Sequence, residues 1–93
     1  MKQDSANLAD LLRAAGLKPT RQRLALGALL FQDAHRHVSC ESLYEEAVRA
    51  RADLSLATVY NTLNQFEAAG LVREVRLDAE RRWFDSYVSR DHL

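Results

Sequence analysis

The sequence has little of the residue types that mark secreted, disulfide-rich or membrane proteins. It contains one cysteine, one proline and three glycines in 93 residues, and no apolar run approaches the roughly 20 residues that a transmembrane helix needs. The single Cys40 cannot form an intramolecular disulfide and cannot by itself make a zinc framework. The amino terminus, MKQDSANLAD, lacks the basic and then apolar layout of a signal peptide. These absences predict a cytoplasmic protein with no membrane partner.

An excess of charge of either sign is also lacking, since 13 basic and 13 acidic residues give a formal net charge of zero. A neutral chain is not expected to hold nucleic acid by bulk electrostatics alone. The charges are unevenly distributed, however, because the charged residues of segment 16–38 are mainly basic and those of segment 39–54 are mainly acidic. Nucleic-acid binding therefore depends on where the charges lie in the fold.

Catalytic signatures are absent as well. No histidine, carboxylate and nucleophile stand at a recognisable spacing, and no glycine-rich phosphate loop occurs. The sequence therefore predicts a protein that is not an enzyme. With 47% hydrophobic residues, 93 residues are enough for one compact core and too few for two ordinary domains.

Hydrophobic periodicity predicts four helices followed by one hairpin. The helices cover about residues 7–15, 20–31, 39–51 and 55–69, and the strands cover residues 71–77 and 82–86. Thr20, Ser39 and Ser55 are suitable N-caps, and Gly16 and Gly70 are suitable helix ends. The expected fold class is mainly α with a small antiparallel β-hairpin, arranged as a winged helix-turn-helix. On the third helix, the charges of Glu41, Glu45, Glu46 and Arg49 are typical of a solvated face.

The fourth predicted helix is the most informative segment. Four apolar residues share one stripe that should face the core, namely Leu56, Val59, Leu63 and Phe66. No charged residue occurs between Ser55 and Phe66, and the opposite face presents Ala57, Thr58, Asn61, Asn64 and Gln65, with Tyr60 at its flank. Amides and hydroxyls suit hydrogen bonding to base edges, whereas a routine solvent face normally carries Lys or Glu. We interpret this as the recognition helix of a DNA-binding domain. An uncharged face that docks on a partner protein is the alternative interpretation.

Basic residues flank this helix in the predicted fold. Contacts with phosphates or the minor groove are expected from Lys18, Arg21 and Arg23 at the second helix and from Arg81 and Arg82 at the hairpin. The hydroxyls of Ser55 and Thr58 lie at a helix N-terminus, where backbone N–H groups favour a phosphate. Scattered surface charge is the competing explanation for the three residues at the second helix.

Four segments together carry a family resemblance: GLKPTRQR, HVSCESLYEEA, LSLATVYNTLNQFEAAGLV and the hairpin ending RRWFD. They closely resemble the N-terminal domain of the Fur family of metal-responsive repressors, from about Leu8 onward. Asn61 after Tyr60, where arginine is usual, is most similar to the Irr branch of iron-response regulators. The resemblance implies a winged-helix DNA-binding domain at residues 1–86, and residues 87–93 are expected to begin a hinge toward a dimerisation domain that this chain lacks.

The resemblance also implies a function and roles for individual residues. A homodimer of the full-length protein is expected to bind double-stranded DNA at an AT-rich inverted repeat and to regulate genes of iron homeostasis. Matching positions assign base contacts to Tyr60 and Asn61 and a minor-groove contact to Lys18. Backbone contacts fall to Arg23, Ser55, Ala57 and Thr58, and Arg81 matches the basic residue of the family's wing. A winged-helix module that contacts proteins without sequence-specific DNA binding remains the alternative function.

Three residues match metal-ligand positions of the family. His37 precedes Val38, Asp85 follows Phe84, and His92 lies in a DHL ending that resembles a histidine-rich hinge. Mixed nitrogen and oxygen ligands suit Fe²⁺, Mn²⁺ or Zn²⁺. Haem is a further candidate cofactor of a full-length protein, although the Cys-Pro pair associated with haem sensing does not occur here. Cys40 is expected to fill space rather than to react.

Overall fold

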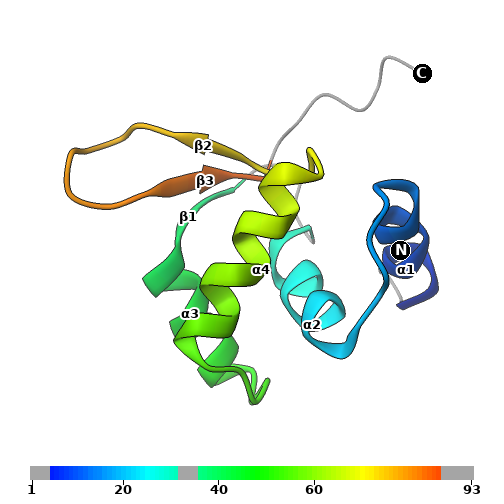
Figure 1. Cartoon of the computed structure of the whole chain (residues 1–93). Helices are drawn as coiled ribbons and strands as arrows, with labels where there is room; N and C mark the ends of the chain where they lie inside the picture. The colour runs from blue at the N-terminus through cyan, green and yellow to red at the C-terminus, as the bar shows by residue number, and fades with distance from the viewer. Residues whose placement is uncertain (1–4, 32–35, 87–93) are drawn as a thin grey trace.

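The computed structural model describes residues 5–31 and 36–86 and shows four helices with a small sheet (Figure 1). The elements follow in the order α1 (Ser5–Ala14), α2 (Arg21–Leu30), β1 (His37–Ser39), α3 (Cys40–Arg49), α4 (Leu56–Ala68), β2 (Arg73–Val75) and β3 (Trp83–Asp85). The loop between β2 and β3 projects beyond the helices as a wing (Figure 1). This confirms the predicted winged-helix class. Within the described ranges, no helix combines the length and the apolar character that a membrane crossing requires.

Side-chain caps begin three of the helices, as the sequence predicts. The hydroxyls of Thr20, Ser39 and Ser55 each accept a hydrogen bond from the backbone N–H three residues further along. At Ser39 the cap is reciprocal, because the Ser42 hydroxyl accepts from the Ser39 backbone N–H at 3.0 Å. The turn after α4 places Gly70 at a φ of 82°, in the left-handed region that favours glycine. Local chemistry therefore sets where these helices begin and end.

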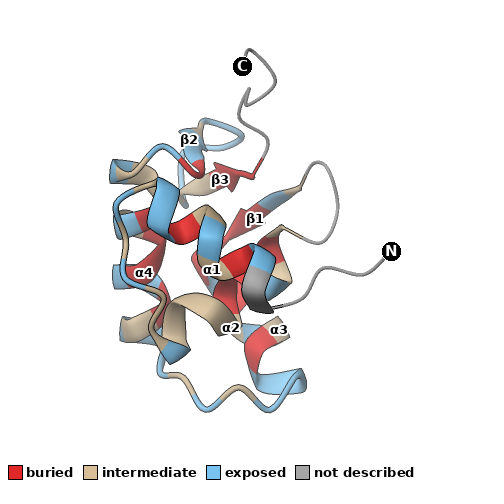
Figure 2. Ribbon diagram, turned by 90° about the vertical axis from the view of Figure 1, so that its right-hand side faces the viewer, coloured by how far each residue is buried: buried red, intermediate tan, exposed pale blue. Residues whose placement is uncertain are grey.

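The core lies where α2, α3 and α4 meet beneath the sheet (Figure 2). Among the described residues, eight helical side chains are fully buried, one from α1 and the others from α2, α3 and α4, namely Leu12, Leu26, Leu30, Leu43, Ala47, Val59, Leu63 and Phe66. Val72 and Phe84 extend this core toward the sheet, each with only 1% exposure. The rings of Phe31 and Phe66 pack with their centroids 5.9 Å apart. The packing fixes α4 with one side inward and the other available to solvent.

The prediction of the buried stripe on α4 is wrong for one residue. Leu56 is 45% exposed, while Thr62, predicted on neither face, is buried. The first turn of α4 extends past the edge of the core, so that Ser55, Leu56 and Ala57 are all exposed. Periodicity gives the angular position of a residue on a helix, but it does not show where along the helix axis the core ends.

The predicted two-stranded hairpin is incomplete, because the sheet has three antiparallel strands in the order β1-β3-β2. The sequence predicts no strand before α3, but β1 pairs with β3 there and places Val38 opposite Phe84. The strand predicted at residues 71–77 is shortened to Arg73–Val75. Three residues are too few for an alternating pattern to be visible, and the partner strand is distant in sequence. The predicted hinge, residues 87–93, lies outside the described residues.

Candidate nucleic-acid interface

The exposed face of α4 carries most of the predicted base-reading residues. Ala57, Tyr60, Asn61 and Gln65 are exposed, with Tyr60 at 44%. Asn64 is half-buried at the side that faces the wing. The face therefore offers hydroxyl and amide groups to a partner, free of formal charge.

Two hydroxyls at the start of α4 are engaged with each other. The Ser55 hydroxyl accepts from the Thr58 backbone N–H at 3.1 Å and donates to the Thr58 hydroxyl oxygen at 3.0 Å. Ser55 thus acts first as the helix cap. The Thr58 hydroxyl keeps its own hydrogen for an acceptor such as a phosphate oxygen.

The start of α2 lies beside α4 and brings its basic residues to the same surface. The Arg23 guanidinium donates from Nε to Gln65 Oε1 at 3.1 Å and from Nη1 to the Lys18 carbonyl at 2.9 Å. Arg21 donates to the Asp53 carbonyl, in the turn before α4, at 3.4 Å. A hollow of about 270 Å³ between α2 and α4 is lined by Thr20, Gln22, Arg23, Thr58, Asn61, Thr62 and Gln65. Arg23 and Gln65 therefore hold each other at this surface.

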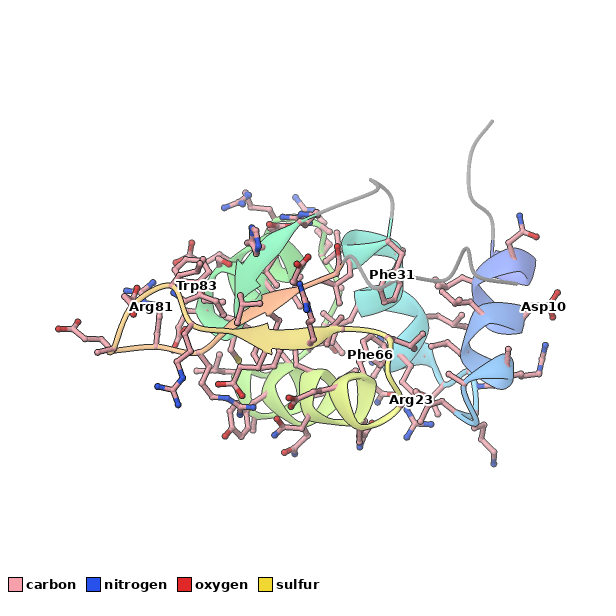
Figure 3. All side chains as sticks on the ribbon, turned by 90° about the horizontal axis from the view of Figure 1, so that it is seen from above. Asp10, Arg23, Phe31, Phe66, Arg81 and Trp83 are labelled. Carbon is pink, nitrogen blue, oxygen red and sulfur yellow. The ribbon has the colours of Figure 1, made fainter. Side chains whose placement is uncertain are left out.

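Arg81 lies on the wing, and Figure 3 shows α4 between Arg81 and Arg23. The Asp78 carboxylate organises the turn that carries Arg81. It accepts from the backbone N–H groups of Glu80 at 2.9 Å and Arg81 at 3.1 Å, and from the Trp83 indole N–H at 3.1 Å. These hydrogen bonds, the one from Trp83 first, lower the pKa of Asp78 below its ordinary value. The exposed Arg81 guanidinium lies 5.8 Å from the centre of the Trp83 ring.

The Arg82 side chain, for which a phosphate contact is predicted, is 35% exposed and has partners within the protein. Its guanidinium turns toward α4 and donates to Tyr60, Asn64 and Glu67, and also to Glu74 of β2. Arg81 and Arg82 both precede β3, but their guanidinium groups have different partners, because Arg81 lies near the Trp83 ring whereas Arg82 bonds to α4 and β2. Sequence reasoning missed this cluster because its members are distributed over three elements.

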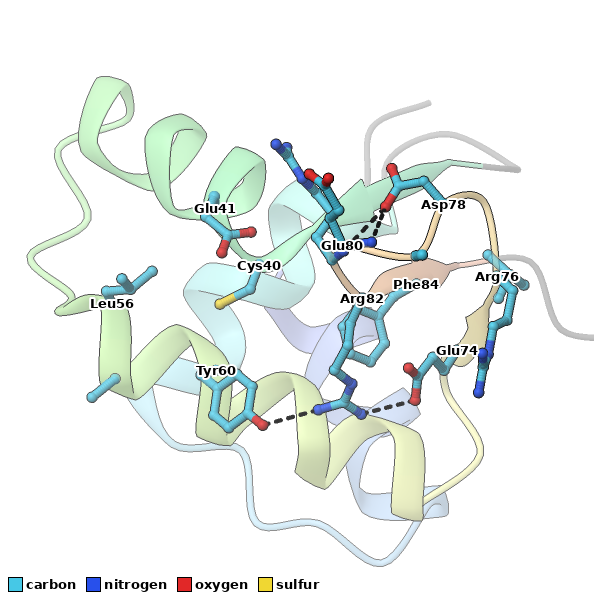
Figure 4. A pocket seen from close by; sticks show the side chains of 14 residues that line it. Cys40, Glu41, Leu56, Tyr60, Glu74, Arg76, Asp78, Glu80, Arg82 and Phe84 are labelled. Atoms are coloured by element: carbon cyan, nitrogen blue, oxygen red, sulfur yellow. Dashed lines mark hydrogen bonds and ion pairs between the residues drawn. The ribbon is translucent and has the colours of Figure 1, made fainter.

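A pocket of about 680 Å³ separates the start of α4 from the wing (Figure 4). Cys40 lines it from the start of α3, and burial, followed by the nearby Glu41 carboxylate, raises the pKa of its thiol. A raised pKa keeps the thiol protonated and therefore less reactive. The raised pKa favours the predicted unreactive role of Cys40.

The register of the sheet brings together two of the three metal-ligand candidates. His37 of β1 faces Asp85 of β3, with 3.7 Å between His37 Nε2 and Asp85 Oδ2. The Asp85 side chain is 5% exposed, and its Oδ2 also lies 3.8 Å from Arg73 Nη2. His92 lies outside the described residues. Within residues 5–31 and 36–86, no group of three histidine, cysteine or acidic residues is placed to hold a metal ion.

A sequence model of the ferric uptake regulator family matches residues 14–93 of the chain. The ferric uptake regulation protein of Pseudomonas aeruginosa is 42% identical over 81 residues, which cover 87% of this chain and 60% of that protein. The corresponding protein of Haemophilus ducreyi is 36% identical over 84 residues, covering 88% of this chain and 56% of the relative. The chain therefore spans little more than half the length of these relatives.

Solved structures share the fold. The ferric uptake regulator from Pseudomonas aeruginosa with manganese has a TM-score of 0.81 at 40% identity and aligns with 91% of this chain and 63% of its own. The Vibrio cholerae ferric uptake regulator, described with rearranged DNA-binding domains, has a TM-score of 0.76 at 36% identity, covering 90% and 63%. The peroxide-sensing regulator PerR from Streptococcus pyogenes has a TM-score of 0.68 at 25% identity, covering 94% and 59%.

Proposed function

The chain belongs to the ferric uptake regulator family, and from this membership we propose that it is a sequence-specific DNA-binding transcriptional regulator of iron-responsive genes. The uncharged, exposed face of α4 between Arg23 and Arg81 is the observation that carries the proposal. A face of this kind suits reading in the major groove, while flanking cations suit phosphates and the minor groove. We assign this activity to residues 1–86 and propose that a dimer binds an AT-rich inverted repeat.

We assign base contacts and DNA-backbone contacts to different residues according to their positions on this surface. Tyr60, Asn61 and Gln65 would read bases, whereas Lys18, Arg21 and Arg23 would hold the DNA backbone together with Arg81. Ser55, Ala57 and Thr58 would pack against phosphates at the start of α4. The Tyr60-Asn61 pair supports placement in the Irr branch of the family, and repression is the mode of regulation that the family resemblance favours.

Selection of bound duplexes from a random pool, with and without iron, tests the proposal. We expect a defined AT-rich motif, and binding that weakens steeply with salt at a logarithmic slope of about −0.9 for each phosphate neutralised. Equal weak binding to every duplex would contradict the proposal and favour a module that contacts proteins.

The proposed roles of Asn61 and Arg23 separate in a pair of variants. Asn61→Ala should reduce discrimination between the selected site and single-base variants by about tenfold, since one good base contact contributes in this range. Arg23→Ala should weaken all duplexes about equally. Fluorescence anisotropy across a panel of duplexes measures both effects. The same binding profile for both variants would show that Asn61 and Arg23 do not have separate roles in base recognition and backbone binding.

We also propose that His37 and Asp85 form part of a regulatory metal site, with His92 as a further ligand. The imidazole and the nearly buried carboxylate supply mixed nitrogen and oxygen donors, which suit Fe²⁺, Mn²⁺ or Zn²⁺. Two donors are fewer than such ions usually take from protein, so further ligands must complete the set. Equilibrium dialysis of Mn²⁺ should show weaker binding for His37→Ala than for the parent protein, and unchanged binding would remove His37 from the site.

A further inference from the structure

Arg82 of the wing is hydrogen-bonded to both α4 and β2 through one guanidinium group (Figure 4). Nη1 donates to the Tyr60 hydroxyl oxygen and to Asn64 Oδ1, both at 3.1 Å. Nη2 donates to Glu67 Oε1 at 3.4 Å and to Glu74 Oε1 at 3.0 Å. The guanidinium carbon also lies 5.6 Å from the centre of the Tyr60 ring and 5.0 Å from that of Phe84. The planar group therefore fixes the wing against the outer side of α4.

The charge of Arg82 is used within the protein. Glu67 and Glu74 both lie within ion-pair distance of Nη2, and the side chain of Arg82 is only 35% exposed. The hydrogen bond from Arg82 lowers the pKa of Glu74, which keeps that carboxylate ionised. A guanidinium held by two carboxylates has little attraction left for a DNA phosphate.

The bonds from Arg82 decide which hydrogen-bonding groups α4 presents. A guanidinium can only donate, so the Tyr60 oxygen and the Asn64 carbonyl oxygen must both turn toward it. The Tyr60 hydroxyl hydrogen and the Asn64 amide hydrogens are then left to point elsewhere. Tyr60 and Asn64 lie one turn apart on α4, on the side next to Asn61. Acceptors in the major groove that match such donors are N7 of purines, O6 of guanine and O4 of thymine.

We propose that Arg82 is a specificity-determining positioning residue that locks the wing to α4 and presents Tyr60 and Asn64 as hydrogen-bond donors to base acceptors. This proposal rests on the proposed DNA-binding function. Arg82 acts through Tyr60 and Asn64 rather than by touching the DNA. When the net charge of the protein is kept constant, substitution of Arg82 should therefore change the base preference more than the overall affinity for DNA.

The test must separate positioning from charge, because Arg82→Ala alone leaves Glu67 and Glu74 uncompensated beside the DNA-binding face. The double variant Arg82→Ala with Glu74→Gln has the same net charge as the parent protein. Arg76→Ala is the matched control, because Arg76 lines the same pocket but donates no hydrogen bond to α4 among the described residues. Binding is measured on the selected duplex and on its single-base variants.

We expect the charge-matched double variant to bind the selected duplex within about threefold of the parent and to lose about tenfold in discrimination at one or two base positions. Arg76→Ala should keep the parent's preference at every position. In a Tyr60→Phe background, Arg82→Ala should cause a smaller loss, because the two residues act through one interaction. Circular dichroism confirms that each variant is folded. If Arg82→Ala does not fold, Arg82→Lys carries the same test, since it keeps the charge and lacks the planar fork.

The outcomes distinguish the two proposals. A parent protein without sequence preference overturns the proposed function and this inference together. A selective parent whose charge-matched variant keeps full discrimination overturns the inference alone, and it shows that Arg82 serves only to compensate Glu67 and Glu74.

Discussion

At the scale of single residues, Arg36 and Glu46 join neighbouring segments of the fold. The Arg36 guanidinium donates to both carboxylate oxygens of Glu46 and, at 2.8 Å, to the Leu29 carbonyl near the end of α2. Both side chains of the ion pair are 24% exposed. The pair therefore connects α2 and α3 to the segment that leads into β1, although Glu46 belongs to an acidic run that predicted a solvated face.

The contribution of this pair can be measured against a neighbouring carboxylate. Glu46→Ala should lower the free energy of unfolding by about 1–2 kcal/mol, because it removes charge-assisted hydrogen bonds that are only partly screened by solvent. Glu45→Ala, which removes an exposed carboxylate one position earlier, should change it by less than about 0.5 kcal/mol. Urea denaturation followed by circular dichroism gives both values. Equal effects would mean that the ion pair adds nothing beyond a surface charge.

At the scale of elements, the wing depends on one carboxylate because its strands have three residues each. Asp78 accepts from two backbone N–H groups of the turn and from the Trp83 indole. These bonds close the loop and hold Trp83, the only tryptophan in the chain, against it. A short hairpin without such a fixed loop is marginally stable in water.

The wing should consequently loosen in acid before the helices do. The folded pKa of Asp78 is below its ordinary value of 3.8, so its stabilising contribution is complete above that value and is lost as the pH falls through the folded pKa. Trp83 fluorescence should report this step, while circular dichroism follows the helices. Asp78→Ala should show the acid-like fluorescence already at neutral pH, and Glu80→Ala should not. Identical spectra for both variants would argue against a role for the Asp78 carboxylate.

At the scale of the whole molecule, the fold distributes the charges of a neutral chain unevenly over the surface. The sum of charges is zero, yet the fold gathers Lys18, Arg21 and Arg23 beside α4. The same fold uses Arg82 and Arg36 internally against carboxylates. Arg21 and Arg23 therefore lie beside α4, whose outer face is exposed because Val59, Leu63 and Phe66 pack inward.

Substitution of two leucines of α4 tests where the core ends along this helix. Leu63 is fully buried and Leu56 is 45% exposed, so the same leucine-to-alanine change meets two environments on one helix. Leu63→Ala should cost about 2–5 kcal/mol of unfolding free energy, and Leu56→Ala less than about 1 kcal/mol. Urea denaturation measures both. Comparable losses would show that the first turn of α4 is packed more tightly than its exposure indicates.

Helix positions were predictable because their signals are local. The caps at Thr20, Ser39 and Ser55 and the stop at Gly70 need no information about distant residues. Strand β1 was not predictable, since its three residues pair only with β3, far along the chain. The inward turn of Arg82 was missed for the same reason, because its acceptors lie on α4 and β2.

The sequence by itself determined the four helices, the hairpin that follows them and the uncharged face of α4, because periodicity and capping act over a few residues. Only the tertiary structure decided that Leu56 lies outside the core and that β1 completes the sheet. It also decided that His37 meets Asp85 and that Arg82 bonds to α4 and β2. Each of these depends on contacts between segments that are remote in sequence, and no local pattern encodes such distances.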